Sequence, residues 1–540
     1  MRIGRSREHP WLAGLALALA LIGLPVEAGD LGASAVEAEV RRTNNRSPQF
    51  FISEADVGFF MNYTGYAYSN RAHGEGERFL KAEIGSRALE MIAAAEKTII
   101  MSIFLFDSFY APQEGQRDLV TPVVDALLER RRNVPDIRIA VILDPSHKAY
   151  GQRQSPAEKI FRGNGIDVFY SDLVSGLKKA SPVGFRETMG HANRLLDTIS
   201  FHGWGYFWSG LFSRARIPTR FDGEPVSIES AYNAFLMKAN HRKLLVTDVH
   251  GQEYVAMITS ANPHSASGYH VNSAVTVKGD AARYVHNLLR LDMMHSAGLG
   301  RLYAHWHYDA TRRYRKTYFS KRITPLPLDL PVSADRGPDR AVGVTVVTES
   351  RIPEAIIERL HAVRPGDEIR IQMFYLSFQP VLDAVLHATT ITENPVRILL
   401  DANKDSFNKV KDGTPNRQVA RYLLREARKA GGNLEVRWYS THGEQNHAKT
   451  MSITNARTGA YFLTTGSCNW TGRNMDGVNM ESNIIVDGAP RVNRAFDDLF
   501  DLFWTNRDGN EYSLDYEVYQ DAASDVRWRR GEKPYYLSTF

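Results

Sequence analysis

Two short segments of the sequence carry a histidine and a lysine separated by one residue. His241 and Lys243 lie in the first half of the chain, and His447 and Lys449 lie in the second. Side chains alternate along a strand, so the two side chains of each pair project from the same face. Each pair is followed by a Ser-x-Asn segment and, ten residues after its asparagine, by a further asparagine: Ser260, Asn262 and Asn272, then Ser467, Asn469 and Asn479. Two copies with matching downstream spacing indicate a functional site far more strongly than one copy.

Two imidazoles and two ammonium groups are suited to the cleavage of a phosphodiester. The lysines would neutralise the non-bridging phosphate oxygens while charge builds in the transition state. One neutral imidazole can attack phosphorus in line and form a covalent phosphohistidine, and the other, protonated, can donate to the departing alkoxide and then activate water or an alcohol. This chemistry requires no metal and no cofactor. The alternative is two buried polar networks in the core, which we disfavour because lysine is rarely buried without an anionic partner.

These paired segments resemble the motifs of the phospholipase D superfamily, whose members carry two His-x-Lys-x4-Asp motifs followed by Ser-x-Asn segments. The resemblance covers most of residues 95–505, apart from an insert and a linker. Two departures stand out: Thr454 occupies the place of the second motif's aspartate, and Ala274 is aligned with Glu481 of the second half. Each half has therefore lost one carboxylate, so we expect an asymmetric site and allow for reduced activity.

The resemblance also implies a role for each motif residue. It implies that His241 is the nucleophile and His447 the general acid and base, although the reverse order stays open. Asp248 and Glu481 are the candidates to orient the imidazole N–H groups. The residues expected to bind the substrate phosphate, or to fix the lysines, are Ser260, Asn262, Ser467 and Asn469. These four residue types also make ordinary turns, which is the competing interpretation.

The elements that must position these residues occur twice in the same order. The predicted strands are 98–106, 137–143 and 166–170 in the first half, and 368–375, 396–400 and 434–438 in the second, with helical patterns near 119–128, 381–386 and 419–430. Asp144 and Asp401 end equivalent strands, where they begin an active-site loop or cap a helix. We therefore predict an α/β fold of two phospholipase D-like repeats, each a mostly parallel, helix-flanked sheet, packed with pseudo-two-fold symmetry.

The two repeats set the predicted domain boundaries. Residues 45–322 form the first lobe, 323–340 a linker with four prolines, and 341–540 the second lobe. The first lobe carries an extra segment near 174–238 that is rich in aromatic residues and glycine. It is either a packed lid or a loop that faces a substrate or an interface.

The first 28 residues have the pattern of a cleaved export signal. They combine three arginines, an apolar run of 13 residues and a small-residue cleavage site at Ala28. The run is shorter than the roughly 20 residues needed to cross a bilayer. Removing this segment takes away three Arg and two Glu and lowers the formal charge from +5 to +4. We expect an exported protein, periplasmic or secreted, whose single cysteine, Cys468, is an inert core residue.

The sequence thus favours an enzyme that acts on phospholipids at a membrane surface, as a hydrolase or a phosphatidyltransferase, with water or an alcohol as acceptor. We expect a monomer. Residues 312–322 hold six basic residues and three aromatics, as a solvated face or as a contact to anionic lipid or nucleic acid. One alternative is an exported nuclease, which the modest charge disfavours. The other is a catalytically reduced binding or scaffold protein, which the lost carboxylates at Thr454 and Ala274 support.

Overall fold

The computed structural model describes residues 45–70, 75–106, 117–144, 156–171, 216–217, 226–227, 239–290, 292–293, 341–406, 409–410, 413, 415–477 and 479–519. The predicted signal peptide, the linker and the basic stretch 312–322 lie outside these residues. So does the aromatic insert, apart from the two-residue strands β7 (Arg216–Ile217) and β8 (Val226–Ser227).

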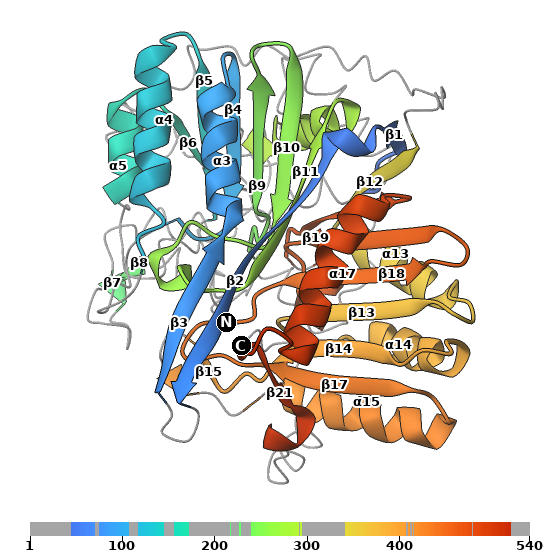
Figure 1. Ribbon diagram of the computed structural model, residues 1–540. Helices are drawn as coiled ribbons and strands as arrows, with labels where there is room; N and C mark the ends of the chain where they lie inside the picture. The colour runs from blue at the N-terminus through green and yellow to red at the C-terminus, as the bar shows by residue number, and fades with distance from the viewer. Residues whose placement is uncertain are drawn as a thin grey trace, which may run out of the picture.

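The first lobe is built on a sheet with the strand order β3-β2-β11-β10-β9-β4-β5-β6 (Figure 1). Its strands are β2 (Val57–Asn70), β3 (Glu75–Ala82), β4 (Thr98–Ile103), β5 (Arg138–Leu143), β6 (Asp167–Tyr170), β9 (Leu244–Val249), β10 (Glu253–Thr259) and β11 (Asn272–Lys278). Its helices are α3 (Glu83–Ala94), α4 (Thr121–Asn133) and α5 (Pro156–Gly163), and a further helix spans 280–290.

The second lobe is built on a sheet with the order β1-β12-β20-β19-β18-β13-β14-β17-β21. Its strands are β1 (Phe50–Ile52), β12 (Val342–Thr348), β13 (Glu368–Met373), β14 (Val396–Asp401), β17 (Leu434–Tyr439), β18 (Lys449–Asn455), β19 (Ala460–Gly466), β20 (Ser482–Asp487) and β21 (Ser513–Asp515). Its helices are α13 (Arg351–His361), α14 (Gln379–Ile391), α15 (Asn416–Ala430), α16 (Gly472–Met475) and α17 (Pro490–Thr505), and a short hairpin joins β15 (Asp405–Ser406) to β16 (Lys409–Val410). The 3-10 turns η1 (Glu54–Asp56), η5 (Ser265–Ser267) and η6 (Tyr516–Tyr519) complete the described elements.

The predicted α/β class is confirmed, but the sheets are mixed and not mostly parallel. Only β4-β5-β6 and β13-β14-β17 pair in parallel, and the other pairings within these two sheets are antiparallel. The antiparallel part arises because the strand after each His-x-Lys pair continues into a meander, β9-β10-β11 and β18-β19-β20. Antiparallel neighbours can be joined by a short turn, as β9–β10 and β18–β19 are, whereas parallel neighbours need a crossover.

Both sheets place corresponding strands in the same order, since β2-β11-β10-β9-β4-β5-β6 matches β12-β20-β19-β18-β13-β14-β17. The pseudo-two-fold relation of the lobes stays a prediction. One boundary differs in detail, because β1, predicted in the first lobe, pairs with β12 of the second. The helical prediction for 419–430 agrees with α15, which ends at Gly431 in the left-handed conformation (φ 71°) that glycine adopts without strain.

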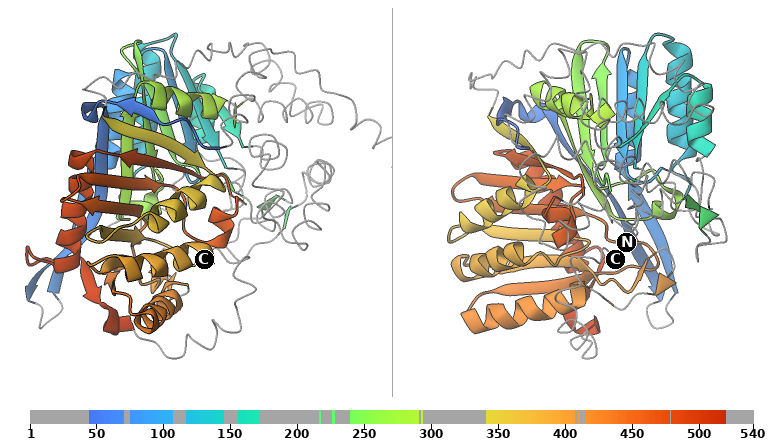
Figure 2. Two further views of the ribbon diagram at one scale, coloured as in Figure 1. Left: turned by 90° about the vertical axis from the view of Figure 1, so that its right-hand side faces the viewer. Right: turned by 180° about the vertical axis from the view of Figure 1, so that it is seen from behind.

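The molecule is layered, with a shared core between the two sheets. In Figure 2, α17 lies on one face of the second sheet and α13, α14 and α15 lie on the other. The largest apolar cluster joins strands of both sheets with α17 and the helix at 280–290, and the outer helices of each lobe form separate clusters. Among the described residues, no helix is both long and apolar enough to cross a bilayer.

Candidate active site

The first His-x-Lys segment ends directly before β9, the second ends in the first residue of β18, and an aspartate fixes the backbone of each. Asp144, after β5, accepts a hydrogen bond from the Asn240 amide, and Asp401, at the end of β14, accepts one from the Asn446 amide at 2.7 Å. The two asparagines precede His241 and His447. The carboxyl ends of the parallel strands therefore position the motifs, and the aspartates act on the motif backbone.

Backbone bridges then join each motif to the opposite lobe. The His241 amide donates to the Met480 carbonyl at 2.9 Å, and the Met480 amide donates to the Ala239 carbonyl at 2.9 Å. In the reciprocal place, the Val271 amide donates to the Gln445 carbonyl at 2.9 Å. Two isolated parallel bridges result, 240 with 480 and 271 with 446. Both motifs therefore lie at the interface between the lobes. The first lies beside the start of β20 and the second beside the start of β11.

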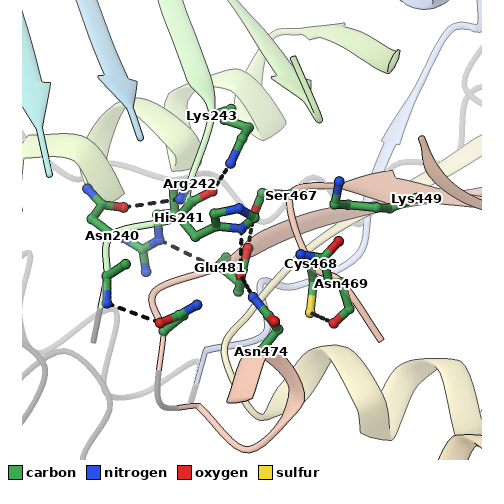
Figure 3. Close-up of polar contacts among 12 residues, drawn as sticks. Asn240, His241, Arg242, Lys243, Lys449, Ser467, Cys468, Asn469, Asn474 and Glu481 are labelled. Carbon is green, nitrogen blue, oxygen red and sulfur yellow. Dashed lines mark hydrogen bonds and ion pairs between the residues drawn. The ribbon is translucent and has the colours of Figure 1, made fainter. Parts of the chain in front are cut away.

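Each imidazole has a partner from the other lobe, and the two partners differ in charge. His241 Nδ1 lies 2.8 Å from Glu481 Oε1, and His447 Nδ1 lies 3.0 Å from Asn272 Oδ1. Both partner oxygens are acceptors, so Nδ1–H donates and the Nε2 lone pair of each ring is left for chemistry. The predicted role of Glu481 as an orienter of an imidazole agrees with this geometry (Figure 3).

The residue equivalent to Glu481 is Asn272, and the alignment of Ala274 with Glu481 is wrong. The Ser260 amide donates to the Ser273 carbonyl, and the Ser467 amide to the Ser482 carbonyl, each at 3.0 Å. The residues before these carbonyl groups, 272 and 481, therefore correspond. The second half has two more residues between its Ser-x-Asn segment and this position, where α16 lies, so alignment on the asparagines misplaced the register. An amide replaces the carboxylate.

The two motif serines support the imidazole partners. Ser260 Oγ donates to Asn272 Oδ1 at 2.9 Å, and Ser467 Oγ donates to Glu481 Oε2. Each hydroxyl also accepts an amide hydrogen bond at 3.0 Å from the neighbouring strand. A side chain at Gly466 would place its Cβ 2.2 Å from the Ser482 carbonyl oxygen, so glycine permits this close approach. The predicted phosphate-binding role of these serines is not supported, because their single hydroxyl protons are already donated.

The two motif asparagines differ. Asn262 Oδ1 accepts the Leu105 amide at 3.2 Å and so fixes the segment after β4. Asn469 Oδ1 is buried and has no hydrogen-bond partner within the part of the chain that the structure describes. Buried polar atoms are nearly always paired in native proteins, so Asn469 remains the better candidate to contact a substrate.

The motif lysines lie in equivalent environments that the sequence analysis did not identify. Lys243 Nζ donates to the His241 carbonyl at 2.6 Å, and Lys449 Nζ donates to the His447 carbonyl at 2.7 Å. The ammonium groups lie over the rings of Phe104 and Phe374, at 5.2 and 5.3 Å.

The same two phenylalanine rings contact the imidazoles, with centroids 4.9 Å apart in both halves. The signal in the sequence is a phenylalanine directly after β4 and after β13. Comparison of the repeats beyond the motifs themselves would have found this pair.

The site is buried, and burial shifts the pKa of every ionisable group in it. Burial lowers the pKa of His241 to about 4 against the opposing effect of Glu481, and it lowers the pKa of Lys243 to about 7. Burial and the two lysines lower the pKa of His447 well below its usual value. Burial and Lys243 do the same to Lys449. Each lysine also lowers the pKa of the histidine in the other motif, so the four groups repel one another when they are protonated. A bound anion would offset this repulsion.

Asp248 does not reach the imidazoles, and the prediction that it orients one of them is wrong. It lies seven residues beyond His241 along β9, or roughly 20 Å in an extended strand. Its carboxylate accepts backbone amides of Glu96, Lys97, Thr98 and Gly251 at 2.6 to 2.9 Å. These bonds lower the pKa of Asp248 although burial raises it.

The replacement of the second motif's aspartate by Thr454 is equally remote from the chemistry. Thr454 Oγ1 donates to Asp497 Oδ2 of α17 at 2.7 Å. The replacements at Thr454 and Ala274 therefore leave the surroundings of the imidazoles unchanged. The carboxylate missing beside His447 is the one that the amide of Asn272 replaces. Among the described residues, no cluster of three or more His, Cys, Asp or Glu side chains is arranged to bind a metal ion.

The fold and the two motifs define a bilobal α/β protein with one composite site between its lobes. Residues 356–504 match a family model described as "Cardiolipin synthase, PLD-like domain". The phosphatidylserine synthase of Haemophilus influenzae Rd KW20 has a similar fold, with a TM-score of 0.50, 11% identity, and coverage of 94% of this chain and 100% of that one. The second lobe therefore matches a phospholipase D-like domain, which agrees with the resemblance that the motifs predicted.

Two further comparisons complete this result. A phospholipase D family member, Nuc from Salmonella typhimurium, aligns over 32% of this chain and 98% of its own, with 16% identity and a TM-score of 0.25, which supports no structural conclusion. No curated protein matches the sequence.

Proposed function

We propose that this protein is a metal-independent phosphodiesterase or phosphatidyltransferase that acts on phospholipids through a phosphohistidine. The observation that carries the proposal is the reciprocal pairing at the lobe interface, His241 with Glu481 and His447 with Asn272. The lipid substrate class is supported by the family description and by the printed name of the structural neighbour, both of which refer to phospholipid synthases.

In the first step, a phosphodiester lies between the two motifs and the lysine ammonium groups neutralise its non-bridging oxygens. Neutral His241 attacks phosphorus through Nε2, and the bond from phosphorus to the head-group oxygen breaks. Protonated His447 donates its proton to that oxygen, so the head-group alcohol leaves and the phosphatidyl group stays on His241. The substrate anion favours the protonated form of His447, because an opposite charge raises the pKa of an imidazole.

In the second step, His447, now neutral, accepts a proton from water or from an alcohol. The resulting oxygen nucleophile attacks phosphorus, and the bond from phosphorus to His241 breaks. Water gives phosphatidic acid and an alcohol gives a new phospholipid, and His447 is again protonated. With either acceptor, the enzyme returns to its starting state.

The asymmetry of the imidazole partners supports His241 as the nucleophile. A phosphohistidine carries positive charge on its ring, and the Glu481 carboxylate, fully buried 2.8 Å from Nδ1, stabilises that charge. His447 has only the neutral oxygen of Asn272 at this place, so its imidazolium gives up a proton more readily. The two histidines thus have separate environments for separate tasks.

The decisive experiment incubates the purified chain with mixed phospholipid vesicles and a short alcohol in EDTA. Head-group release or alcohol exchange is expected for the wild type and is expected to be lost in His241→Ala and His447→Ala. His250→Ala is the matched control, because this side chain is 68% exposed on the surface, and it should retain activity. Equal turnover in either motif variant would contradict the proposal. Cleavage of plasmid DNA in EDTA without head-group release would favour the nuclease, and absence of any phosphoenzyme would favour a binding protein.

We also propose that the mature chain is exported and begins after Ala28. The support is the sequence pattern of residues 1–28. N-terminal sequencing of the protein recovered from the periplasm or the medium tests this directly. Recovery of the intact N-terminus from the cytoplasm would contradict it.

A further inference from the structure

A buried ionic cluster lies beside the active site and takes no part in the mechanism above. Arg242, between the catalytic histidine and lysine, is 1% exposed and points away from them. Its guanidinium lies 2.7 Å from Asp292 of its own lobe and 2.6 Å from Glu349, which follows β12 in the second lobe. Burial of three charges is costly unless they are paired, so their position needs an explanation.

The cluster fixes the peptide of Glu481. The Glu481 amide donates to Glu349 Oε1 at 3.2 Å, and the Glu481 carbonyl accepts from Arg242 Nε at 3.4 Å and from the Glu349 amide at 3.4 Å. Glu349 has a positive φ of 47°, which is uncommon for a residue with a side chain. Backbone on both sides of the Glu481 Cα is therefore bonded to the cluster, while the Glu481 side chain accepts from His241.

Within the part of the chain that the structure describes, the second motif has no such cluster. Ala448 occupies the place of Arg242 between His447 and Lys449. The imidazole partner there is the amide of Asn272, whose side-chain nitrogen donates to the His270 carbonyl at 3.2 Å. Among the described residues, ionic support thus occurs only on the side where the imidazole partner is a carboxylate.

We propose that Arg242 and Glu349 are positioning residues that fix Glu481 against His241. Because Arg242 and His241 belong to one lobe and Glu349 and Glu481 to the other, the cluster makes the geometry of the nucleophile depend on the contact between the lobes. Arg242 has a fixed planar fork that binds two carboxylates at once, which a lysine cannot reproduce. This inference rests on the proposed function, since it concerns the histidine assigned there as the nucleophile.

The test compares Arg242→Lys and Glu349→Gln with Arg370→Lys. Arg370 is a matched control, because it is also buried and lies 2.9 Å from Asp501 and 2.8 Å from Glu368, in the part of β13 that pairs with Ser452 beyond the second motif. We expect a similar loss of thermal stability in both arginine variants. Only Arg242→Lys and Glu349→Gln should lower kcat, by at least tenfold, with KM changed less than twofold. Equal kcat loss in Arg370→Lys, or wild-type kcat in both cluster variants, would overturn the inference.

Two further measurements show whether the cluster acts through Glu481. In a Glu481→Gln background, Glu349→Gln should cause no additional loss of kcat, whereas an independent structural effect would add to it. Histidine-selective ¹⁵N NMR reports the tautomer of His241 without any substrate. We expect the Nδ1–H tautomer in the wild type and in Arg370→Lys, and its loss in Glu349→Gln.

The NMR result separates the two proposals. If the wild type lacks activity on phospholipids but the tautomer changes as expected, the proposed function fails and the positioning role stands. An unchanged tautomer in Glu349→Gln would refute the positioning role whatever the activity.

Discussion

At the scale of single residues, the two imidazoles differ in their hydrogen-bond partners: His241 has the carboxylate of Glu481, and His447 has the amide of Asn272. Asn272→Asp should make the second imidazole pair resemble the first. An added carboxylate beside His447 favours the imidazolium and raises the pKa of His447, by about one unit or more. The general acid then stays protonated to higher pH, so the alkaline limb of the kcat profile should move upward. Profiles between pH 5 and 9 measure this, and an unchanged or lowered alkaline limb would count against the assignment of His447.

The motif lysines should be destabilising, because the fold desolvates them. The pKa of Lys243 is lowered to about 7 in the folded protein, so the unfolded chain binds its proton more tightly. The resulting penalty is fully present below pH 7 and declines as pH rises from 7 toward the ordinary lysine pKa of about 10.4. Lys243→Met should therefore stabilise the protein at pH 6 by about 1–3 kcal/mol while it abolishes turnover.

Thermal melts at pH 6 and pH 9 test this prediction, with Lys429→Met as control. Lys429 is 64% exposed and paired only on the surface with Glu426, so its removal should change little. A gain for Lys243→Met that is as large at pH 9 as at pH 6 would show that lost charge is not the cause.

The sequence identified the two histidines and two lysines of the candidate site because their spacing repeats. It could not identify Asn272 as the partner of His447, since this contact depends on the bridge between Val271 and Asn446 across the lobe interface and not on sequence distance. It also placed Asp248 at the site because the family motif includes it. The structure indicates that a residue can belong to a motif for its backbone contacts alone.

At the scale of elements, Asp248 joins the far end of β9 to the segment that enters β4. Its carboxylate accepts four backbone amides, and these bonds lower its pKa. Asp248→Asn should lower the free energy of unfolding by about 2 kcal/mol at pH 7, because an amide offers one acceptor oxygen in place of two. The wild-type stabilisation is present above the ordinary aspartate pKa of about 3.9 and is lost as pH falls through the lower folded value.

Urea titration at pH 7 with activity measured per folded molecule checks this prediction. The expected result is lower stability and an unchanged kcat. A loss of kcat larger than twofold without loss of stability would return Asp248 to the catalytic residues. The matched substitution in the second lobe is Thr454→Val, which removes one hydrogen bond to Asp497 and should act in the same way with a smaller effect.

The alternation of strand and helix patterns predicted the parallel strands of both lobes to within a few residues. The antiparallel strands were harder to predict, since β10, β11, β19 and β20 are short apolar segments without the long crossover helices that separate the parallel strands. Their buried faces on both sides remove the alternation of apolar and polar residues that marks a half-exposed strand. The sheets are mixed because of these meanders, whereas the strands joined by crossover helices are parallel.

At the scale of the whole molecule, the two lobes share one core. The cluster between the sheets includes Val275 and Leu288 of the first lobe with Val344 and Phe500 of the second. The β2-β3 hairpin adds polar contacts, since Tyr66 of β2 donates to the buried Glu444 carboxylate at 3.0 Å. A composite site requires this continuity, because each imidazole partner lies in the lobe opposite its histidine.

The shared core predicts that the lobes unfold as one unit, and Phe496→Ala tests it. Phe496 lies on α17 of the second lobe, fully buried, with its ring 5.8 Å from the ring of Phe59 on β2 of the first. Removal of this ring should cost about 3–5 kcal/mol. With Trp204, Trp208 and Trp306 of the first lobe replaced by phenylalanine, tryptophan fluorescence reports the second lobe through Trp438, Trp470, Trp504 and Trp528, whereas activity requires both lobes. We expect the two signals to shift together to a lower urea midpoint, and a fluorescence transition that separates from the loss of activity would mean that the lobes fold independently.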